Sequence, residues 1–359
     1  MSFTYLRERL PVLNGRFSLT RLVVAATVLL CLPLLGLAQN DADPRKPVWA
    51  YAITPEMPIA DVRGPQPRPA GATGQAAARQ GAAAADPTLH TLPGSKFQFT
   101  MAQIRSTTDP VDWFPDEHPP VPEIVTHGRP PVVRPCYACH TLNGKGKPEN
   151  APIAGLPKDY LIRQLQEFKS GVRDTADPHK PKDMRGLAQG MTADDMEQAA
   201  AYFSAMPWTP WIRVVEADVI PKVRVGGQAF HLVDDGTTEP IGLRIVEANE
   251  NEAEERLRSP HAGFVAYVPV GAIKKGEALV TTGGGKTLPC VTCHGPDLRG
   301  VGTIPGIAGR GPSYLARQLY DFQTGTRNGA MAPLMKPVVE KLTAEDIVNV
   351  LAYVASRQP

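Results

Sequence analysis

The sequence predicts a mainly α-helical protein with two tandem domains of one type, and two observations support this. First, the stretch from Cys136 to Arg173 repeats from Cys290 to Arg327 at a constant offset of 154 positions, without a gap. Second, apolar residues within each copy recur at the spacing of a helix. Around these domains we expect a Pro- and Ala-rich, partly disordered N-terminal extension and an extended or β-containing inter-domain segment.

The first 38 residues have the organisation of a signal peptide. Four arginines and one glutamate precede an apolar run from Leu22 to Leu37, and small residues lie just before Gln39. This predicts export to the periplasm, with cleavage after Ala38. The alternative is an uncleaved membrane anchor, although 16 apolar residues are fewer than a spanning helix needs.

Removal of residues 1–38 changes the formal net charge from +2 to about −1, because this segment carries four arginines and one glutamate. A chain with this balance lacks the basic surface that nucleic-acid binding requires. Export also brings the four remaining cysteines, which form two close pairs, into an oxidising compartment where vicinal thiols ordinarily become disulfides. The sequence therefore excludes nucleic acid as a partner and predicts that another group occupies these cysteines.

Residues 39–128 form the N-terminal extension. Its tract from Gly71 to Ala85 is rich in alanine, glycine and glutamine and has no apolar periodicity. Such a tract cannot bury enough surface to offset its ordering entropy, so we expect residues 61–88 to be disordered. The aromatic residues of Trp49–Tyr51 and Phe97–Phe114 are expected to pack against the domains that follow.

The two domains are predicted at residues 129–210 and 271–359, each with a short helix holding the cysteines and two longer helices. In the first copy the middle helix stops at Gly171, and Thr192 is the N-cap of the last helix, with Asp195 three residues on. About 70 residues with few apolar side chains make a poor core by themselves. A large apolar cofactor would complete such a core.

Residues 211–270 separate the domains and differ from them in character. Trp211–Val215 and Pro221–Val225 alternate and are rich in β-branched residues, which predicts short strands or extended segments. The acidic stretch Glu247–Glu255 is expected to be a solvated loop or a helical turn.

Both repeats carry the pattern of covalent c-type haem attachment, Cys136-Tyr-Ala-Cys-His140 and Cys290-Val-Thr-Cys-His294. Two thiols about one helical turn apart can each add to one vinyl group of a porphyrin. The adjacent histidine then faces the iron. The alternatives are a redox-active dithiol and a zinc site. Zinc needs four clustered ligands, and no second cysteine pair accompanies either motif.

The ligand at the sixth position of each iron decides between electron transfer and catalysis. Beyond Arg173 the second copy is shorter by three residues, so the two copies align at an offset of 151. This alignment makes Met184 and Met335 equivalent positions. These two methionines, each in a loop before the last helix, are the predicted distal ligands. His179 is the rival in the first domain, whereas packing explains Met191 and Met331 more simply. The remaining histidines are expected to be surface or structural residues, namely His90, His118, His127, His231 and His261.

Together these motifs resemble class I cytochrome c domains, and the pair resembles the dihaem cytochromes of the c4 type. The shared features are the Cys-x-x-Cys-His motif, an apolar-Ala-Gly turn, Tyr-Leu-x-x-Gln-Leu-x-x-Phe-x-x-Gly-x-Arg, a methionine, and a Thr-capped helix ending in Ala-Tyr. The resemblance implies two covalent haems, each with histidine and methionine on its iron. The residues that it implies are Cys136, Cys139, His140 and Met184 in the first domain and Cys290, Cys293, His294 and Met335 in the second.

The resemblance also implies a proline whose carbonyl bonds the haem-ligating histidine. Pro305 occupies that place, whereas Pro152 lies one residue too close to Ile153, which puts this bond in doubt in the first domain. The domains are about 80 residues apart, so close packing about a pseudo-twofold axis is only weakly implied. Four residues are expected either to reach haem propionates or to pack at a surface, namely Tyr160, Arg173, Tyr314 and Arg327.

Histidine and methionine together saturate the iron, which is the arrangement of an electron carrier. We therefore expect a periplasmic dihaem cytochrome that carries single electrons from a respiratory or dehydrogenase donor to an acceptor such as an oxidase or another cytochrome. The alternatives are a dihaem enzyme, such as a peroxidase or a thiosulfate dehydrogenase, and the cytochrome subunit of a larger dehydrogenase. Such an enzyme needs an open or labile iron. Membrane association is expected only through a partner or an uncleaved signal segment.

Overall fold

The computed structural model describes residues 43–52, 86–176, 183–226 and 229–359. The predicted signal peptide, residues 61–85 of the stretch expected to be disordered, and His179 lie outside the described residues. The chain divides into two units, Met1–Asp43 and Pro44–Pro359, and all the elements below belong to the second. No helix within the described part of the chain is long and apolar enough to cross a membrane.

In the first helical domain, the predicted caps define the ends of the helices. Thr192 Oγ1 accepts the Asp195 N–H at 3.1 Å, and the Asp195 carboxylate accepts the Thr192 N–H at 2.9 Å, so the two residues form a capping box. Gly171 ends the middle helix in the left-handed conformation, with φ of 82°. The helices are α6 (Tyr137–His140), α7 (Lys158–Ser170), α8 (Asp183–Gly190) and α9 (Ala193–Ala205).

The second helical domain repeats this order, and Thr343 and Asp346 form the equivalent capping box. The expectation that the two methionines lie in loops is wrong, because Met184 lies on α8 and Met335 on α14. Glycines in one of these helices and prolines in the other weaken the helical signal of the sequence. The helices are α12 (Val291–His294), α13 (Pro312–Thr324), α14 (Ala332–Val339) and α15 (Ala344–Ala355).

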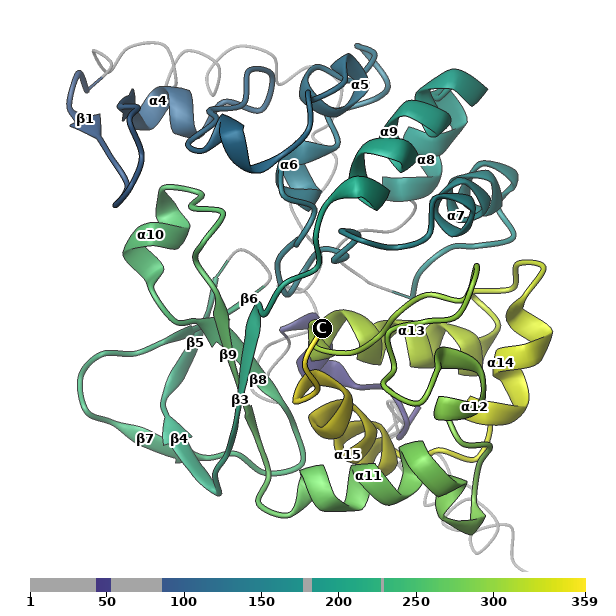
Figure 1. Cartoon of the computed structure of the whole chain (residues 1–359). Helices are drawn as coiled ribbons and strands as arrows, with labels where there is room; N and C mark the ends of the chain where they lie inside the picture. The colour runs from purple at the N-terminus through teal and green to yellow at the C-terminus, as the bar shows by residue number, and fades with distance from the viewer. Residues whose placement is uncertain (1–42, 53–85, 177–182, 227–228) are drawn as a thin grey trace, which may run out of the picture. The chain divides into compact units, whose positions relative to one another are not determined.

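A further helix, α11 (Ala272–Thr282), precedes the attachment motif of the second domain and is followed by a short 3-10 helix, η3 (Gly283–Gly285). Figure 1 shows α11 lying along α15. Gly276 makes this contact possible, because a Cβ at this position would lie 1.9 Å from the carbonyl oxygen of Asn349. The glycine is therefore required by the close approach of two helices.

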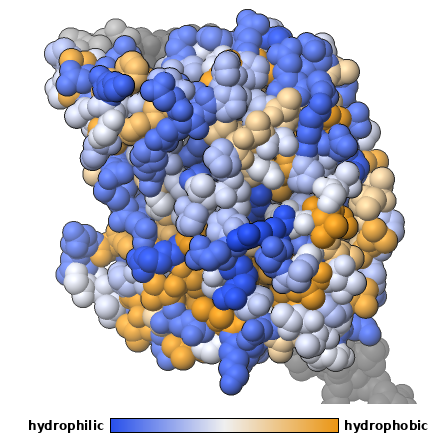
Figure 2. All heavy atoms as spheres, in the orientation of Figure 1, coloured by the Kyte–Doolittle hydropathy of each residue, from blue (hydrophilic) through white to orange (hydrophobic). Residues whose placement is uncertain are grey.

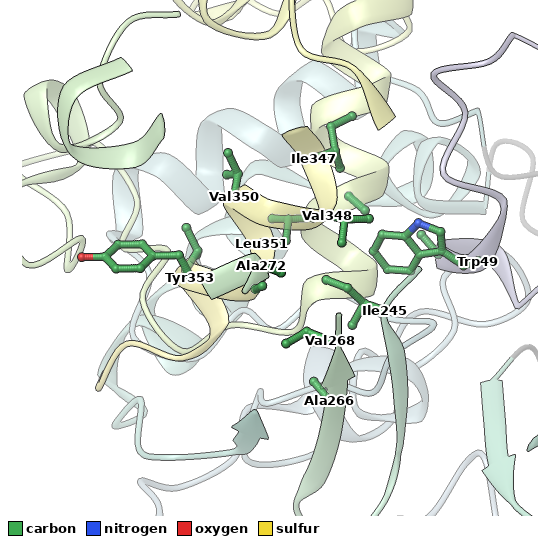
Figure 3. Close-up of a cluster of buried hydrophobic side chains, with 14 of the residues drawn as sticks. Trp49, Ile245, Ala266, Val268, Ala272, Ile347, Val348, Val350, Leu351 and Tyr353 are labelled. Carbon is green, nitrogen blue, oxygen red and sulfur yellow. The ribbon is translucent and has the colours of Figure 1, made fainter. Parts of the chain in front are cut away.

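The larger hydrophobic core joins α11, α15, the inter-domain sheet and the N-terminal 3-10 helix η1 (Val48–Tyr51). Figure 3 shows side chains of α15, among them Val348 and Leu351, close to Ile245 and Trp49. Burial of each large apolar side chain stabilises the fold by about 1.5–3 kcal/mol. Trp49 is 6% exposed, which confirms that the aromatic residues of this early segment pack against later parts of the chain.

A mixed sheet of strands in the order β3-β9-β8-β6-β5 occupies the inter-domain segment. β3 runs parallel to β9 and β6 parallel to β8, whereas β8 with β9 and β5 with β6 are antiparallel. The predicted extended segments correspond to β3 and β5. The strands of this sheet are β3 (Ile212–Glu216), β5 (Val223–Gly226), β6 (Ala229–Leu232), β8 (Val246–Asn249) and β9 (Phe264–Val268), and β4 (Val219–Pro221) pairs separately with β7 (Thr238–Pro240).

The expectation that the acidic stretch Glu247–Glu255 is solvated is wrong for Glu247. It lies on β8 and is 2% exposed, and only the following α10 (Glu252–Arg256) is a surface helical turn. The Glu247 carboxylate accepts the Ser313 N–H at 3.0 Å, at the start of α13. Helix N-termini offer unpaired N–H groups and favour negative charge. Burial raises the pKa of Glu247, and its hydrogen bond ties the sheet to the second helical domain.

The described part of the N-terminal extension consists of short elements. Trp113 is 3% exposed, and its Nε1 donates to the carbonyl oxygen of Leu257 at 2.8 Å, so this part of the extension packs on the inter-domain segment. Its elements are β1 (Leu89–His90), β2 (Phe99–Thr100), α4 (Met101–Ile104), η2 (Pro115–Glu117) and α5 (Glu123–Thr126).

Candidate haem-binding sites

Each attachment motif lies on one turn of helix that starts at its first cysteine. Cys136 and Cys290 are the N-caps of α6 and α12, and the second cysteine and the histidine follow on the same turn. None of the four cysteines of the two motifs forms a disulfide. Burial raises the pKa of Cys136 to about 12 and that of Cys290 to about 11. Burial thus disfavours the thiolate form of the first cysteine of each motif.

A backbone carbonyl orients the histidine of each motif. His294 Nδ1 lies 2.8 Å from the carbonyl oxygen of Pro305, and His140 Nδ1 lies 2.9 Å from that of Ala151. Ala151 and Pro305 are equivalent positions of the repeat. The hydrogen bond to the histidine of the first domain, which the position of Pro152 had put in doubt, is therefore present. It requires only a backbone carbonyl, which Ala151 supplies as well as a proline would. Engagement of Nδ1 makes Nε2 the ring atom that can bind iron.

In the first domain, the predicted site residues line one cavity. Cys136, Cys139 and His140 of the attachment motif share it with Met184 of α8. Met191 also lines it, but this residue is 4% exposed and belongs to the helical core. The remaining walls are mostly apolar and include Ile153, Leu156, Leu161, Leu165, Phe168 and Phe203. Thiols, an imidazole and a thioether around an apolar space are the groups that a covalent haem requires.

In the second domain, the predicted distal ligand lies on the helix that precedes the capped last helix, as in the first. Met335 of α14 is partly buried and packs against the cluster that contains Phe322. Met331 is 41% exposed at the start of the same helix. Met335 is therefore the better enclosed of the two methionines.

A network of repeat-equivalent polar side chains joins the two domains. Arg173 Nη2 donates to Tyr314 Oη at 3.2 Å and to Gln318 Oε1 at 2.8 Å. In the opposite sense, Arg327 Nη2 donates to Tyr160 Oη at 3.0 Å and to Gln164 Oε1 at 2.8 Å. The two sets are related by the repeat offset. The tyrosines and arginines expected either to reach propionates or to pack at a surface thus form the contact between the domains.

Hydrogen bonds from backbone N–H groups to two carboxylates also join the domains, and they too are related by the repeat in a pseudo-twofold manner. The Ala176 N–H donates to Asp321 Oδ1 at 2.8 Å, and the Ala330 N–H donates to Glu167 Oε1 at 3.1 Å. Arg173 and Arg327 also form an isolated antiparallel bridge. The domains therefore pack through equivalent residues despite the long segment between them. Sequence reasoning missed the glutamines and carboxylates, although each occupies a matching polar position on a helix of the repeat.

Two arginines of the second domain reach into the first. Arg310 donates to the carbonyl oxygens of Pro152 and Ala154 at 3.0 and 2.9 Å and lies 4.3 Å from the ring centroid of Trp208. Burial lowers the pKa of Arg310 to about 10. Arg317 lines the cavity of the first domain and donates to the carbonyl oxygen of Pro148 at 2.9 Å. Buried positive charge thus borders the first haem site.

Comparisons with known proteins agree with this geometry. The profile of the cytochrome c family matches residues 132–207 and 273–358. Cytochrome c4 of Pseudomonas aeruginosa is 26% identical over 223 residues, which is 61% of this chain and 82% of the relative. The thiosulfate dehydrogenase electron acceptor of Thiomonas intermedia is 26% identical over 234 residues, 64% of this chain and 81% of the relative. Cytochrome c-554(548) of Halomonas halodenitrificans is 37% identical over 70 residues, 19% of this chain and 84% of the relative.

Both matched stretches contain one complete attachment motif and one predicted distal methionine. The paired cysteines in two such domains imply covalent haems. The predicted resemblance is confirmed, as is the mainly helical fold with a β-containing segment between the domains. The chain belongs to the cytochrome c family, as a dihaem cytochrome with two cytochrome c domains that is homologous to cytochrome c4 over about 61% of its length.

Proposed function

We propose that this dihaem cytochrome is a periplasmic carrier of single electrons whose two irons are each closed by histidine and methionine. The observation that carries the proposal is the cavity of the first domain, where both thiols, the imidazole and the thioether line one apolar space. The attachment residues proposed are Cys136, Cys139, Cys290 and Cys293, and the axial ligands proposed are His140, Met184, His294 and Met335.

Haem iron supplies the one-electron chemistry, and side chains of this protein set its surroundings. The carbonyl oxygens of Ala151 and Pro305 hold the two imidazoles so that Nε2 is directed to the iron. Met184 and Met335 would be the second ligands of the two irons and would exclude water and peroxide from them. Both axial positions are then filled, which suits electron transfer rather than catalysis.

The contact between the domains supports transfer of electrons from one haem to the other. Arg173, Tyr314 and Gln318 line the cavity of the first domain and also hold the two domains together. The first haem would therefore border the surface through which the domains meet. Electrons would cross this surface without leaving the protein.

The predicted signal peptide supports a periplasmic location, and the relatives support redox proteins as partners. One relative is named as an electron acceptor of thiosulfate dehydrogenase, so a dehydrogenase is a suitable donor for this chain as well. An oxidase or another cytochrome would be the acceptor. N-terminal sequencing of the mature protein tests the location, because cleavage after Ala38 is expected and retention of the first 38 residues would contradict export with cleavage.

Exposed apolar side chains mark a surface on which a redox partner can dock. Met331 and Leu334 of the α14 region are 41% and 60% exposed, and Leu288, just before Cys290, is 55% exposed. Figure 2 shows hydrophobic residues near the right edge of this face, where Figure 1 shows α14. Apolar groups of this kind suit a transient contact with another protein. Leu334→Glu should therefore slow electron exchange with a partner co-purified from the native host and leave both reduction potentials unchanged.

Optical spectra of the holoprotein test the ligand assignment. Wild-type protein should show two low-spin haems with a methionine-to-iron charge-transfer band. Met184→Ala and Met335→Ala should each remove about half of that band, because each opens one iron. Met191→Leu and Met331→Leu are the matched controls and should leave it intact. A high-spin haem in the wild type, or its rapid reaction with peroxide, would favour the enzyme alternatives instead.

A further inference from the structure

A second cavity lies beside the first attachment motif, whose Tyr137 forms part of its wall. Its volume is about 450 Å³, within the range of small-molecule sites. The matched stretches begin at residue 132 and end at residue 207 in this region. Part of the wall comes from within them, but residues 104–118, 209 and 258–261 contribute the rest and lie outside. The additional segments of this chain therefore complete the cavity.

The apolar part of the wall is extensive. Trp113 is 3% exposed and fixed by its hydrogen bond to the inter-domain segment. Such a rigid aromatic surface can receive the apolar body of an organic ligand. The other apolar residues of the wall include Ile104, Val111, Phe114, Leu142 and Met206.

Two carboxylates at this cavity are already paired with histidines. His118 Nε2 lies 3.0 Å from Asp112 Oδ2, and His118 Nδ1 lies 2.9 Å from the carbonyl oxygen of Pro119. Both partners are acceptors, so the protonated ring can donate to both of them. The hydrogen bond that His118 donates to the Asp112 carboxylate raises the pKa of His118. Glu117 Oε2 lies 2.8 Å from His261 Nε2.

Two cations at the cavity have no carboxylate in contact. Among the described residues, neither Lys145 nor Arg258 lies within 4.0 Å of a carboxylate oxygen. Lys145 Nζ donates to Thr209 Oγ1 at 2.7 Å, and burial lowers the pKa of Lys145 although Glu117 opposes this. Arg258 donates to the carbonyl oxygen of Ala138 at 3.1 Å. The cavity therefore holds positive charge that its own carboxylates do not neutralise by contact, and an anion would stabilise it.

Backbone strain at the cavity wall is a separate observation. Thr141 lines the cavity with φ of 64° and ψ of 162°, a region that only glycine adopts readily. The equivalent residue of the second domain is Gly295, with φ of 86° and ψ of 158°. Thr141 Oγ1 donates to Asn143 Oδ1 at 2.5 Å, and Asn143 Nδ2 donates to the carbonyl oxygen of Pro260 at 2.9 Å. These bonds hold the strained wall in place, as is typical of functional sites.

We propose that this cavity binds a small organic carboxylate. Its anionic group lies against Lys145 and Arg258, and its apolar body lies against Trp113 and Leu142. The site shares no lining residue with the cavity of the first attachment motif, but it adjoins the residues that directly follow His140.

Calorimetric titration of the holoprotein with benzoate at low ionic strength tests the proposal. One saturable site per chain is expected in the wild type. Lys145→Met keeps a side chain of similar length but removes the charge of Nζ, which lies 4.8 Å from the centroid of the Trp211 ring, and it should weaken binding at least tenfold, as should Arg258→Met. Lys274→Gln, which changes the net charge equally at an exposed position of α11, should bind benzoate as the wild type does.

Three results would overturn the proposal, namely no saturable binding by the wild type, unchanged affinity in both methionine variants, or equally tight binding of inorganic sulfate. Unaltered haem spectra in the variants show that they remain folded. A crystal of the wild-type protein with 4-bromobenzoate provides a test that needs no variant. Anomalous density for bromine inside the cavity is expected, and bromine found only elsewhere on the protein would contradict the assignment.

Discussion

Replacement of Asp321 by asparagine should change how the stability of the protein depends on pH. Asp321 of α13 is 1% exposed at the contact between the domains, and burial raises the pKa of its carboxyl from 3.8 to about 6. Ionisation in the folded protein is therefore less favourable than in the unfolded chain by about 3 kcal/mol. Between about pH 4 and about pH 6 the folded protein binds more protons than the unfolded chain does. The free energy of unfolding therefore falls as the pH rises through this range. The contribution is fully present below about pH 4 and is lost as the pH rises through about 6.

The asparagine of D321N keeps an oxygen that can accept the Ala176 N–H, but it has no proton to lose. The free energy of unfolding of D321N minus that of the wild type should therefore rise by about 3 kcal/mol between about pH 4 and about pH 7. Guanidinium titrations of both holoproteins, followed by circular dichroism, measure this difference. Tyr314→Phe removes a hydroxyl from the same interface and serves as the control, with a difference from the wild type that stays constant over this range. A D321N difference that is equally constant would refute the reasoning.

Two further perturbations probe the packing and the electrostatics. Gly276→Ala should lower the free energy of unfolding by about 3 kcal/mol, because its Cβ would overlap the backbone of α15, whereas Gly186→Ala on α8 meets nothing within 4 Å and should raise it by about 1 kcal/mol. Thermal unfolding compares the two, and equal losses would contradict the packing described for α11. Arg317→Gln should lower the reduction potential of the first haem by on the order of tens of millivolts, because a buried cation favours the reduced iron. Arg317→Lys keeps the positive charge, so its first haem should have a reduction potential close to that of the wild type. Spectroelectrochemical titration measures both variants, and equal potentials in Arg317→Gln and the wild type would contradict this electrostatic role.

Local signals allowed the sequence to predict most of the two helical domains. A threonine cap such as Thr192, a glycine stop such as Gly171 and a pair of cysteines one turn apart act over a few residues. The internal repeat then identified the equivalent caps, stops and cysteines in the two domains. The contact between the domains could not be predicted in the same way, because Gln164 accepts a hydrogen bond from Arg327, which lies in the other copy. A matching glutamine in each repeat does not indicate which residue of the other copy it bonds.

The inter-domain segment was predicted least well, because its structure depends on partners far apart in the chain. Strand β9, Phe264–Val268, is mostly buried on both faces and therefore shows no alternation of apolar and polar residues. Glu247 lies in an acidic stretch and is buried only because it meets the start of α13. His118, expected to be a surface or structural residue, has a side chain that is 9% exposed and lines a cavity to which four separated segments contribute.

Intact mass spectrometry of protein matured in an exporting host tests the central claim most directly. The four cysteines of Cys136–Cys139 and Cys290–Cys293 should all be consumed as thioethers. We expect a mature chain heavier by two haem groups, with none of these cysteines open to alkylation under denaturing conditions. A mass equal to the bare polypeptide, or one increased by a single haem, would contradict a dihaem electron carrier.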